Sequence, residues 1–472
     1  MQDTVHAELR SLGRPRPPAP APLEKAPRGL GFLRAMRHSP IEGLTQAHFG
    51  QAIVTTKTLV GTIMVVSSPA ALRHVLIENA ANYRRERLQR QILASGLGIG
   101  LLAAESEQWR SQRRVMGPIF GPKAVAGFAG EMTAAAASLV QKWTLLPEGS
   151  RIDVSTEMSR PTIDIVRRTL LGDGLGDDAD KIHPALMHYH NTAGRLDPLD
   201  VFEAPQWMPR IGRWRARRSI ALFRRIGDAA VEARRHRLAT ARASAPNDLL
   251  TALLETRDPK TGQRLSTQEV KDNVATFIAV GSETSASALT WTLYLLSLDP
   301  EWRERVEAEV DRELPDGEYM DGSLDRLVAT RAVIEEALRL YPPVPVTTRQ
   351  AIGADRLEQQ EVAPGTIIII APWVVHRHRL LWQAPDLFDP SRFLPGARET
   401  IDRFAYLPFG VGSRTCIGAS FAMQELMILL ATIVRTFRLD LAPGHKVWPL
   451  HRVTLRPQGG MPMILYRRRH LR

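Results

Sequence analysis

Two stretches near the start of the chain alternate apolar and polar residues, which predicts β-strands. Residues 51–60 read QAIVTTKTLV and residues 62–68 read TIMVVSS, with Gly61 between them. β-Branched residues with a period of two suit a half-buried strand, and a glycine between two such runs suits a turn. Residues 366–370, which read TIIII, form a second strand-like patch much later in the chain. Strands are therefore expected in two small regions only.

Apolar positions elsewhere recur every three to four residues, which predicts amphipathic helices. The expected helices cover residues 105–116, 123–146, 155–171, 301–314 and 324–341, and one more follows Cys416 and ends near Phe437. A capping box at residues 266–269 opens the longest helix, which Asp299 and Pro300 close. At ~1.5 Å per residue this helix would span about 49 Å, enough to cross a whole domain. The expected fold class is therefore mainly α.

The most apolar segment, residues 274–298, has the length of a membrane span but a polar centre. Glu283 is its only charged residue, and Gly281, Ser282 and Thr284 lie beside it in the sequence. A bilayer would penalise these groups heavily, so we expect a buried core helix and no transmembrane segment.

The chain divides into a leader at residues 1–30 and a domain at residues 31–472. Six prolines lie between Pro15 and Pro27 without an apolar signal core, which predicts a disordered or extended leader. No later linker or internal repeat interrupts the chain, so residues 31–472 are expected to form one domain. We expect the protein to be a monomer.

The chain is basic, with a formal net charge of +12, and only eight of its 62 basic residues are Lys. This balance favours acidic partners. No zinc finger or RNA-recognition motif accompanies it, so we expect no nucleic acid and favour an acidic protein partner. Residues 210–225 contain seven Arg, and we favour a solvated helix face there over a helix on a membrane surface.

The only cysteine, Cys416, excludes an intramolecular disulfide, which fits a cytoplasmic protein. A lone cysteine is more often an inert core residue than a ligand. Here, however, Gly410 and Gly412 permit a tight turn before it, and Gly418 would let the backbone approach a flat ligand. The helix that begins just after it favours a thiolate, and Arg414 adds positive charge. A thiolate presented in this way is what a haem iron needs as an axial ligand.

Residues 409–418 resemble the haem-binding loop of the cytochrome P450 superfamily. The family's fixed Phe, Gly, Arg, Cys and Gly correspond to Phe409, Gly412, Arg414, Cys416 and Gly418, and Gly410 is also expected to contact the cofactor. The resemblance runs from about residue 39 to residue 465. It implies a cytochrome P450 fold, a single large helical domain with a small β-rich region. It also implies a haem b between the long central helix and the helix after Cys416, with Cys416 as the metal ligand.

Two segments resemble the parts of the family that support this loop. Glu336 and Arg339, three residues apart on a helix, could pair. The resemblance implies that Arg392 completes this set and holds the loop beneath the haem. His376 and His378 lack a third ligand at a recognisable spacing, so a structural role is preferred over a metal site.

Four residues resemble the family's contacts to the haem propionates: Trp109, Arg113, Arg349 and Arg414. Each arginine taken alone could equally be a surface residue. Together they give three cations for two carboxylates, which is reasonable charge matching.

Residues 280–284, in the centre of the long helix, resemble the segment that passes over the iron in the family. The family's Gly, acid and Thr correspond to Gly281, Glu283 and Thr284, and Gly281 is expected to contact the cofactor. A carboxylate and a hydroxyl there can bond to dioxygen and relay protons, and the Thr can break the helix hydrogen bonding locally. Val280 departs from the usual Ala or Gly, and its branched side chain would narrow the space above the iron.

The resemblance implies a haem-thiolate monooxygenase that inserts one atom of dioxygen into an organic substrate and releases the other as water. Cys416 would favour O–O cleavage, while Glu283 and Thr284 would deliver protons. One cysteine cannot hold an iron–sulfur cluster and no flavin-binding segment is found, so electrons are expected from an acidic ferredoxin or flavodoxin with its reductase. Arg110 and Arg114 are the expected docking cations.

Two rival functions remain, a peroxide-driven haem-thiolate peroxygenase or isomerase, and a non-catalytic haem sensor. The pair of Glu283 and Thr284 argues against the first, because peroxide-driven enzymes need no proton relay to oxygen. The same segment and the lack of an attached output domain argue against the second.

The substrate pocket is expected to be lined by Leu97, Phe277, Val280, Val344, Val346 and Met461. These side chains are apolar, so the expected substrate is apolar or amphipathic, for example a fatty acid, a terpenoid or an aromatic compound. Met461 belongs to residues 456–462, which resemble the family's C-terminal substrate-site hairpin.

Overall fold

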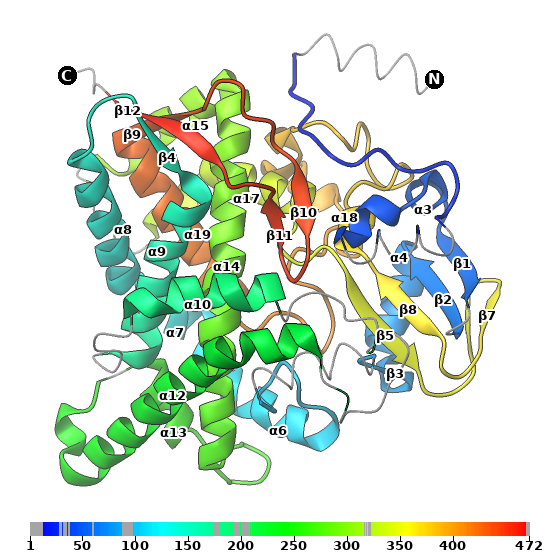
Figure 1. Ribbon diagram of the computed structural model, residues 1–472, viewed down its shortest axis with the longest axis horizontal. Coiled ribbons are helices and arrows are strands. Elements are labelled where there is room, and N and C mark those ends of the chain that lie inside the picture. Colours follow the sequence, from blue (N-terminus) through cyan, green and yellow to red (C-terminus); the bar gives the residue numbers. More distant parts are fainter. Residues whose placement is uncertain are drawn as a thin grey trace.

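The computed structural model describes residues 13–27, 38–58, 61–86, 98–172, 179–192, 210–246, 248–315 and 322–468, with a few single residues between these ranges. Figure 1 shows most helices on one side of the long helix α14 (Thr267–Leu298) and a small twisted sheet on the other. The expectation of a mainly helical fold with a small β-rich region is therefore confirmed.

The helices come from both halves of the chain. The longer ones are α6 (Ser106–Met116), α8 (Ala129–Thr144), α9 (Val154–Val166), α10 (Ala179–Thr192), α12 (Ile211–Thr240), α14, α15 (Pro300–Glu313), α17 (Val328–Leu340) and α19 (Ala419–Thr436). The shorter ones are α3 (Gln46–Gly50), α4 (Pro69–Arg73), α7 (Pro122–Ala126), α13 (Leu249–Glu255), α16 (Ser323–Arg326) and α18 (Pro372–Val375). The helix expected over residues 123–146 is divided into α7 and α8 at Gly127 and Phe128, which lie outside both helices.

The largest sheet unites the two strand regions expected from the sequence. Its order is β1 (Ile53–Thr58), β2 (Gly61–Val66), β8 (Ile367–Ile370), β5 (Thr347–Ala351) and β3 (Tyr83–Arg84). The first two strands form an antiparallel hairpin that turns at Gly61, whose φ is +117°. β2 and β8 run parallel, so a long connection must separate them along the chain.

Three smaller sheets lie elsewhere. They contain β4 (Ser150–Asp153) with β12 (Pro462–Arg467) and β9 (Phe437–Leu441), the hairpin β6 (Asp355–Leu357) and β7 (Gln360–Val362), and the hairpin β10 (Pro449–His451) and β11 (Leu455–Pro457). The prediction of a hairpin at residues 456–462 is therefore wrong in its position. Its residues end β11 and lead into β12, because Met461 bonds to β4 rather than to β11.

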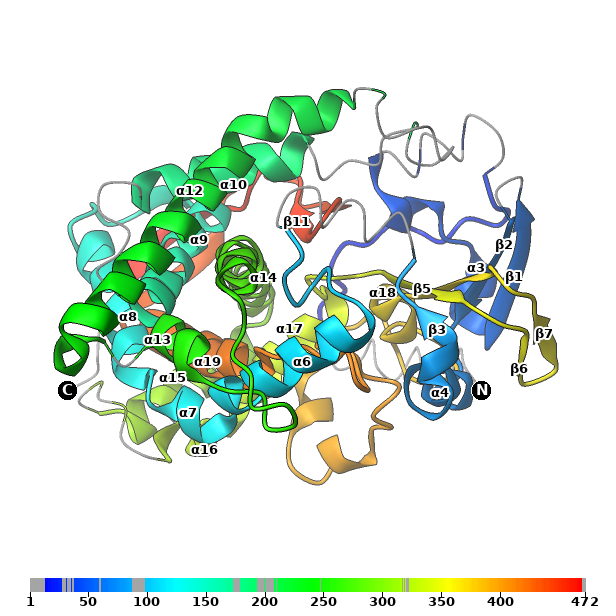
Figure 2. The same ribbon diagram turned by 90° about the horizontal axis from the view of Figure 1, so that it is seen from below.

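The long helix α14 is the axis of the molecule, and Figure 2 looks along it. Ser266 and Glu269 form the capping box expected at its start. Its polar centre lies inside the protein, and both Ser282 and Glu283 are buried. α14 packs against α9, α12, α17 and α19. The prediction of a buried core helix at residues 274–298 is confirmed.

A different described helix, α19, is long and apolar enough to cross a membrane by length and composition. Half of it is buried inside the protein, where it packs against α8 and α14. The buried apolar residues of α19 thus belong to the main core. A core helix of this length needs an apolar surface just as a membrane-spanning helix does.

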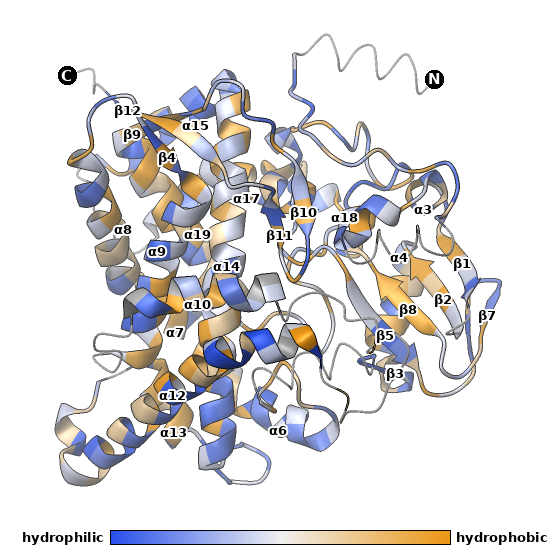
Figure 3. Ribbon diagram, in the orientation of Figure 1, coloured by the Kyte–Doolittle hydropathy of each residue, from blue (hydrophilic) through white to orange (hydrophobic). Residues whose placement is uncertain are grey.

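The arginine-rich residues 210–225 form the start of α12. Arg215, Arg217 and Arg218 are exposed, and Figure 3 shows this part of α12 as largely hydrophilic. The ring of Trp214 is exposed, and the guanidinium carbon of Arg217 lies 4.9 Å from its centroid. These residues are thus exposed, as both alternatives require, and the preference for a solvated helix face over a membrane-surface helix stays a prediction.

Residues 13–27 of the proline-rich leader are extended and packed against the body of the protein. Pro15 accepts a backbone hydrogen bond from Phe388 at 3.0 Å, and Pro18 accepts one from the Tyr341 hydroxyl at 2.7 Å. Arg14 pairs with Asp299 at 3.4 Å. Prolines fix an extended backbone without internal hydrogen bonds, so their carbonyl groups are free to bond to the body. Of the two predicted alternatives, the extended one applies here.

Candidate active site

The loop at residues 409–418 is closed by its own backbone. Cys416 donates its N–H to the Phe409 carbonyl at 2.8 Å. Gly410 and Gly412 both have positive φ, +68° and +80°, which favours glycine. A side chain on Gly412 would also collide with the carbonyl oxygen of Leu76. The tight turn expected before the cysteine is confirmed.

The thiol of Cys416 remains accessible in the folded protein. The side chain is exposed to water, yet the surrounding protein desolvates it and raises the pKa of the thiol. An N–H donor at Gly418 and the charge of Arg113 act in the opposite direction. A Cβ on Gly410 or Gly418 would meet no protein atom within 4 Å, so both glycines border open space. The loop can therefore accept a flat ligand against the sulfur.

Four arginines form a cluster next to this loop. Burial lowers the pKa of Arg113 and Arg349, as it does that of Arg414 to about 10. The fourth, Arg85, is partly buried, and desolvation followed by repulsion from Arg414 and Arg349 lowers its pKa to about 9. It donates to the Leu102 carbonyl, but its Nε has no partner among the described residues.

One carboxylate, that of Glu105, is paired with this cluster in the described part of the chain. Arg414 Nη2 lies 3.0 Å from Glu105 Oε1, and the guanidinium stacks 4.0 Å from the Trp109 ring centroid. Buried cations need nearby anions to offset the loss of hydration. A ligand that carries two carboxylates would supply them, so the residues present fit a haem with its two propionates.

The centre of α14 differs in part from the expectation. The Thr284 hydroxyl donates to the Val280 carbonyl at 3.0 Å, but the helix continues unbroken through this turn. Glu283 is turned toward the hairpin β10–β11, where Thr454 donates to its Oε1 at 2.7 Å. The expected local break in the helix is therefore absent. A threonine that bonds to the carbonyl four residues before it can do so without opening the helix.

Gly281 serves the packing of α14 in this structure. A Cβ at this position would lie 3.4 Å from Val166 of α9. The contact between α14 and α9 is the most extensive between any two elements. The glycine thus permits close contact with α9, and its expected contact with the cofactor stays a prediction.

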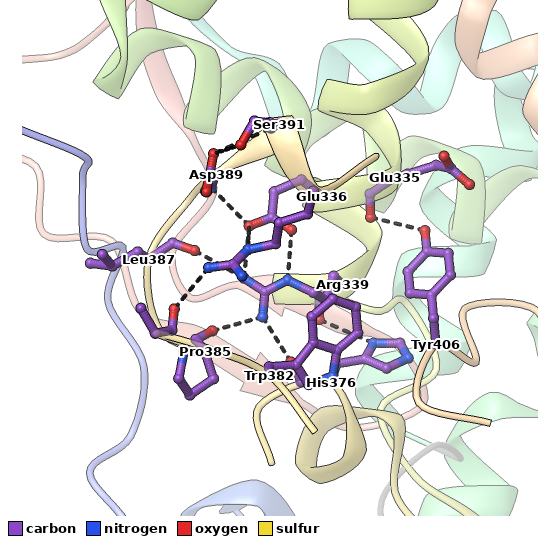
Figure 4. A network of polar contacts seen from close by, with 12 residues as sticks. Glu335, Glu336, Arg339, His376, Trp382, Pro385, Leu387, Asp389, Ser391 and Tyr406 are labelled. Atoms are coloured by element: carbon purple, nitrogen blue, oxygen red, sulfur yellow. Dashed lines mark hydrogen bonds and ion pairs between the residues drawn. The ribbon is translucent and has the colours of Figure 1, made fainter. Parts of the chain in front are cut away.

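Glu336 and Arg339 come together as expected (Figure 4), and Arg392 joins them. Glu336 and Arg339 have no exposed surface, and Arg339 Nε lies 2.6 Å from Glu336 Oε2. Arg392 Nε lies 3.8 Å from the other carboxylate oxygen. Arg339 also donates to the carbonyl groups of His376, Pro385 and Leu387. One buried guanidinium therefore fixes the chain that leads to the cysteine loop.

His376 connects the same helix to that loop, which confirms its structural role. Its Nδ1 lies 3.1 Å from the Arg339 carbonyl, and its Nε2 accepts the N–H of Leu407 at 2.7 Å. Burial lowers its pKa to about 3, so the ring is neutral and can accept this bond. His378 bonds separately to the Gln51 carbonyl at 3.0 Å.

The expected pocket residues are only partly brought together. Leu97 lies outside the described residues. Phe277 and Val280 are partly buried on α14, and the Phe277 ring lies 5.2 Å from that of Phe120. Val346 packs against the main core, whereas Val344 is 45% exposed.

Met461 does not fit the expected pocket. Its side chain is fully buried in the main core, and its N–H donates to Asp153. Met461 is held there by the pairing of β12 with β4, which begins at the next residue. Thr454 and Arg456, on the preceding hairpin, are the residues that reach α14 instead.

Three candidates were missed by the sequence analysis: Arg85, Arg456 and Glu425. The first two are single arginines in a chain rich in arginine. Glu425 lies on the apolar helix α19, where it accepts a hydrogen bond from Ser285 at 2.6 Å and is fully enclosed. An acid within a run of buried aliphatic residues was the one available sign of it.

Comparisons with known proteins agree with this geometry. The family model described as Cytochrome P450 matches residues 15–462. Cyclooctatin synthase of Streptomyces melanosporofaciens is 30% identical over 436 residues, which cover 91% of this chain and 93% of that protein. Cyclooctat-9-en-7-ol 5-monooxygenase of the same organism is 30% identical over 422 residues, 88% of each chain.

The fold is also that of a solved structure. The crystal structure of the cytochrome P450DA heme domain superposes with a TM-score of 0.80 at 25% identity and covers 96% of this chain and 98% of its own. The match thus includes both the helical and the β-rich regions. With its cysteine loop, its arginine cluster and a family match along nearly its whole length, this chain belongs to the cytochrome P450 family, whose cofactor is haem b.

Proposed function

We propose that this chain is a haem-thiolate monooxygenase that inserts one atom of dioxygen into an apolar or amphipathic substrate. One observation carries the proposal: the accessible thiol of Cys416 lies close to Arg113, which belongs to a cluster of four arginines with one carboxylate among them in the described chain. Such a site needs a ligand that takes a thiolate on its face and brings its own anions. Its relatives include a protein named as a monooxygenase.

When bound, the haem supplies reductive activation of dioxygen, and donation from the Cys416 thiolate favours cleavage of the O–O bond. Arg85, Arg113, Arg349 and Arg414 would hold the propionates, and Trp109 would orient Arg414 by stacking. Phe409 packs against the main core and Gly410 and Gly418 leave the loop open on the ligand side. The buried set of Glu336, Arg339 and Arg392 keeps this loop in place from behind.

We assign proton delivery to Glu283 and Thr284. The Thr284 hydroxyl has its proton directed at the Val280 carbonyl, and Glu283 is directed at the hairpin. Catalytic hydrogen bonds are often incomplete before the substrate is bound. In this proposal Glu283 gives a proton to Thr284, which turns from Val280 and passes its own proton on.

The proposed substrate is bulky and mostly apolar. Phe120, Phe277 and Val280 form an apolar wall on and beside α14. One relative is named for a reaction on cyclooctat-9-en-7-ol, which by its name is an alkene with a hydroxyl group. An unsaturated alcohol of this kind is therefore favoured over a simple aromatic compound.

Electrons would come from a separate acidic protein, and the structure revises the docking site expected for it. Arg114 is already paired with Asp258 at 2.7 Å and with Glu107 at 2.9 Å, so its charge is offset within the protein. Arg110, on the same helix, is 60% exposed and only loosely paired with Glu107 at 3.4 Å. We therefore propose Arg110, without Arg114, as the docking cation on α6.

Thr284→Ala tests the monooxygenase mechanism. The haem-loaded enzyme would be supplied with a ferredoxin, its reductase and ¹⁸O₂, with cyclooctat-9-en-7-ol as the first probe. The parent enzyme should place one labelled oxygen in its product. The variant should consume reductant but divert it to hydrogen peroxide, so the fraction that reaches product falls about tenfold or more.

Thr290→Ala is the matched control, because Thr290 makes the same bond to the carbonyl four residues before it, one turn or more from the site. It should leave this fraction unchanged. Turnover with hydrogen peroxide alone, unaffected by Thr284→Ala, would instead support the peroxide-driven alternative. Tight binding of gas ligands without turnover under any condition would support the sensor.

A further inference from the structure

Arg456, on the hairpin β10–β11, is bound to the acid of the oxygen-binding segment. Its Nε lies 3.3 Å from Glu283 Oε1, and Thr454 donates to the same oxygen at 2.7 Å. Only 14% of the Arg456 side chain and 7% of the Glu283 side chain are exposed. An ion pair withdrawn from water in this way is screened less than one at the surface. Arg456 and Thr454 thus fix the orientation of this carboxylate.

The backbone that carries Arg456 is itself fixed to α14. The Leu455 carbonyl accepts hydrogen bonds from Ser287 at 2.5 Å and from the Trp291 ring at 3.1 Å. The Leu455 N–H donates to the Pro343 carbonyl at 2.9 Å. These bonds fix the position of the hairpin along α14. They therefore also fix the position of the Arg456 guanidinium relative to Glu283.

The far end of Arg456 reaches a third element. Its Nη1 lies 3.5 Å from the sulfur of Met187 on α10. Both views show β11 and α10 next to each other beside α14 (Figures 1 and 2). A side chain held at both ends has few alternative rotamers, so little entropy is lost when it binds the carboxylate.

We propose that Arg456 is a positioning residue for proton delivery, which holds the Glu283 carboxylate in a fixed resting orientation between successive proton transfers. The inference rests on the proposed role of Glu283. A cation in contact with a carboxylate stabilises its charged form, so the carboxylate has a defined position to return to once it has given its proton away. In each cycle Glu283 gains one proton from solvent and gives one to the Thr284 hydroxyl, and the carboxylate then returns to Arg456.

Arg456→Gln removes the charge but keeps most of the length of the side chain. In the haem-loaded enzyme with its redox partner, we expect the fraction of reductant that reaches product to fall about threefold or more, and the solvent isotope effect on kcat to rise. The KM and the substrate Kd from the spin-state shift should change by less than about twofold. Arg456→Lys should restore most of the loss, and Thr454→Val should show a smaller loss.

The effect must pass through Glu283. In a Glu283→Gln background, Arg456→Gln should cause no further loss of coupling to product. An equal loss in both backgrounds would overturn the proposal, because Arg456 would then act on something else. If Glu283→Gln alone left coupling unchanged, the proposed role of Glu283 would fail, and the inference about Arg456 with it.

Unfolding of the haem-loaded protein gives a second test that does not depend on activity. The losses of Tm in Arg456→Gln and Glu283→Gln should be non-additive in the double variant, because both remove one contact. Additive losses would contradict a direct interaction. Arg438→Gln is the control, since it breaks an ion pair with Asp440 at 3.0 Å on β9 and is 49% exposed. It should combine additively with Glu283→Gln and leave coupling unchanged.

Discussion

The chemistry of the proposed haem site depends on individual charged side chains that are shielded from water. Arg85 shows why: desolvation and two neighbouring arginines lower its pKa to about 9, and its Nε has no partner in the described chain. A cation in such a place costs stability unless an anion joins it. A bound carboxylate would explain why a cation is found at this position. We therefore propose that Arg85 binds a haem propionate together with Arg349 and Arg414.

Arg85→Gln should weaken haem retention. A charge-assisted hydrogen bond contributes about 1.5–3 kcal/mol, so the rate of haem transfer to apomyoglobin should rise roughly tenfold or more. Arg84→Gln, which changes the exposed neighbour, is the control and should leave the rate unchanged. Equal rates for Arg85→Gln and the parent would remove Arg85 from the haem site.

Glu425 is a buried acid of a different kind. Burial raises its pKa to about 8, and the Ser285 hydroxyl is its one hydrogen-bond donor in the described chain. Between its ordinary value of 4.5 and about 8, the folded protein holds one proton more than the unfolded chain. The free energy of unfolding therefore falls as pH rises through this window. The contribution is complete below the lower value and lost above the upper one.

Glu425→Gln should flatten this dependence, because the amide stays neutral and can still accept from Ser285. At pH 8 the variant should be more stable than the parent by about 1–3 kcal/mol, and at pH 5 the two should be close. Denaturant unfolding at both pH values measures this. Glu304→Gln, at an exposed position on α15, should change neither value. A gain of the same size at pH 5 would show that ionisation of Glu425 is not the cause.

At the scale of elements, close approach of one backbone to another decides where glycine is required. Gly98 and Gly100 precede α6, and a side chain on either would meet Asp272 or Thr276 of α14. The loop is tied there by Ile99, whose N–H donates to Asp272 at 2.8 Å. This glycine series, which resembles a nucleotide-binding loop only superficially, thus permits contact with the central helix.

The cysteine loop offers a matched pair for this argument. Gly410→Ala and Gly412→Ala both place a side chain at positive φ, which costs about 1 kcal/mol. Gly412→Ala alone also collides with the Leu76 carbonyl. We expect Gly412→Ala to lose most of its haem and Gly410→Ala to lose less, since only the first collides with a protein atom, as measured by the haem-to-protein ratio and the ferrous–carbon monoxide spectrum. Equal haem content in the two would show that the loop can move away from Leu76.

At the scale of the whole molecule, the excess of positive charge matters only where it is left unpaired. The formal net charge is +12, but many arginines are used inside the protein. Arg114 and Arg339 are bound to carboxylates, whereas Arg110 stays largely exposed on α6. The binding site of an acidic partner therefore depends on which arginines stay exposed at the surface, and Arg110 on α6 is the one that we propose.

Arg110→Glu should slow electron delivery from an acidic ferredoxin. At low salt we expect the association rate to fall about tenfold, and the difference to disappear near 0.5 M salt because exposed charges are screened. Stopped-flow reduction of the haem-loaded protein measures both. Lys446→Glu makes the same charge change in the turn after β9, at the end of the molecule away from α6 (Figure 1), and serves as the control. Equal slowing by the two variants would point to net charge, not to a site on α6.

The sequence by itself determined the main elements and singled out Cys416 as the candidate metal ligand. Periodicity and a capping box located α14, and alternation with Gly61 located the first hairpin. Cys416 was recognisable because glycines, an arginine and a helix start are all local to it. Glu336 and Arg339 share a helix face, so their pairing also followed from spacing. In each case the chemistry depends on residues within about ten positions of one another.

Only the tertiary structure decided which distant side chains meet. Arg85 reaches the cluster of Arg349 and Arg414 through the sheet and the cysteine loop, and Arg456 reaches Glu283 from a hairpin 171–173 positions away along the chain. Met461 lies outside the expected pocket for the same reason, because its N–H bonds to Asp153 of β4. Sequence spacing carries no information about such contacts, because they depend on how helices and sheets pack. The local pattern thus fixes the cofactor, while packing fixes how charge and protons are controlled around it.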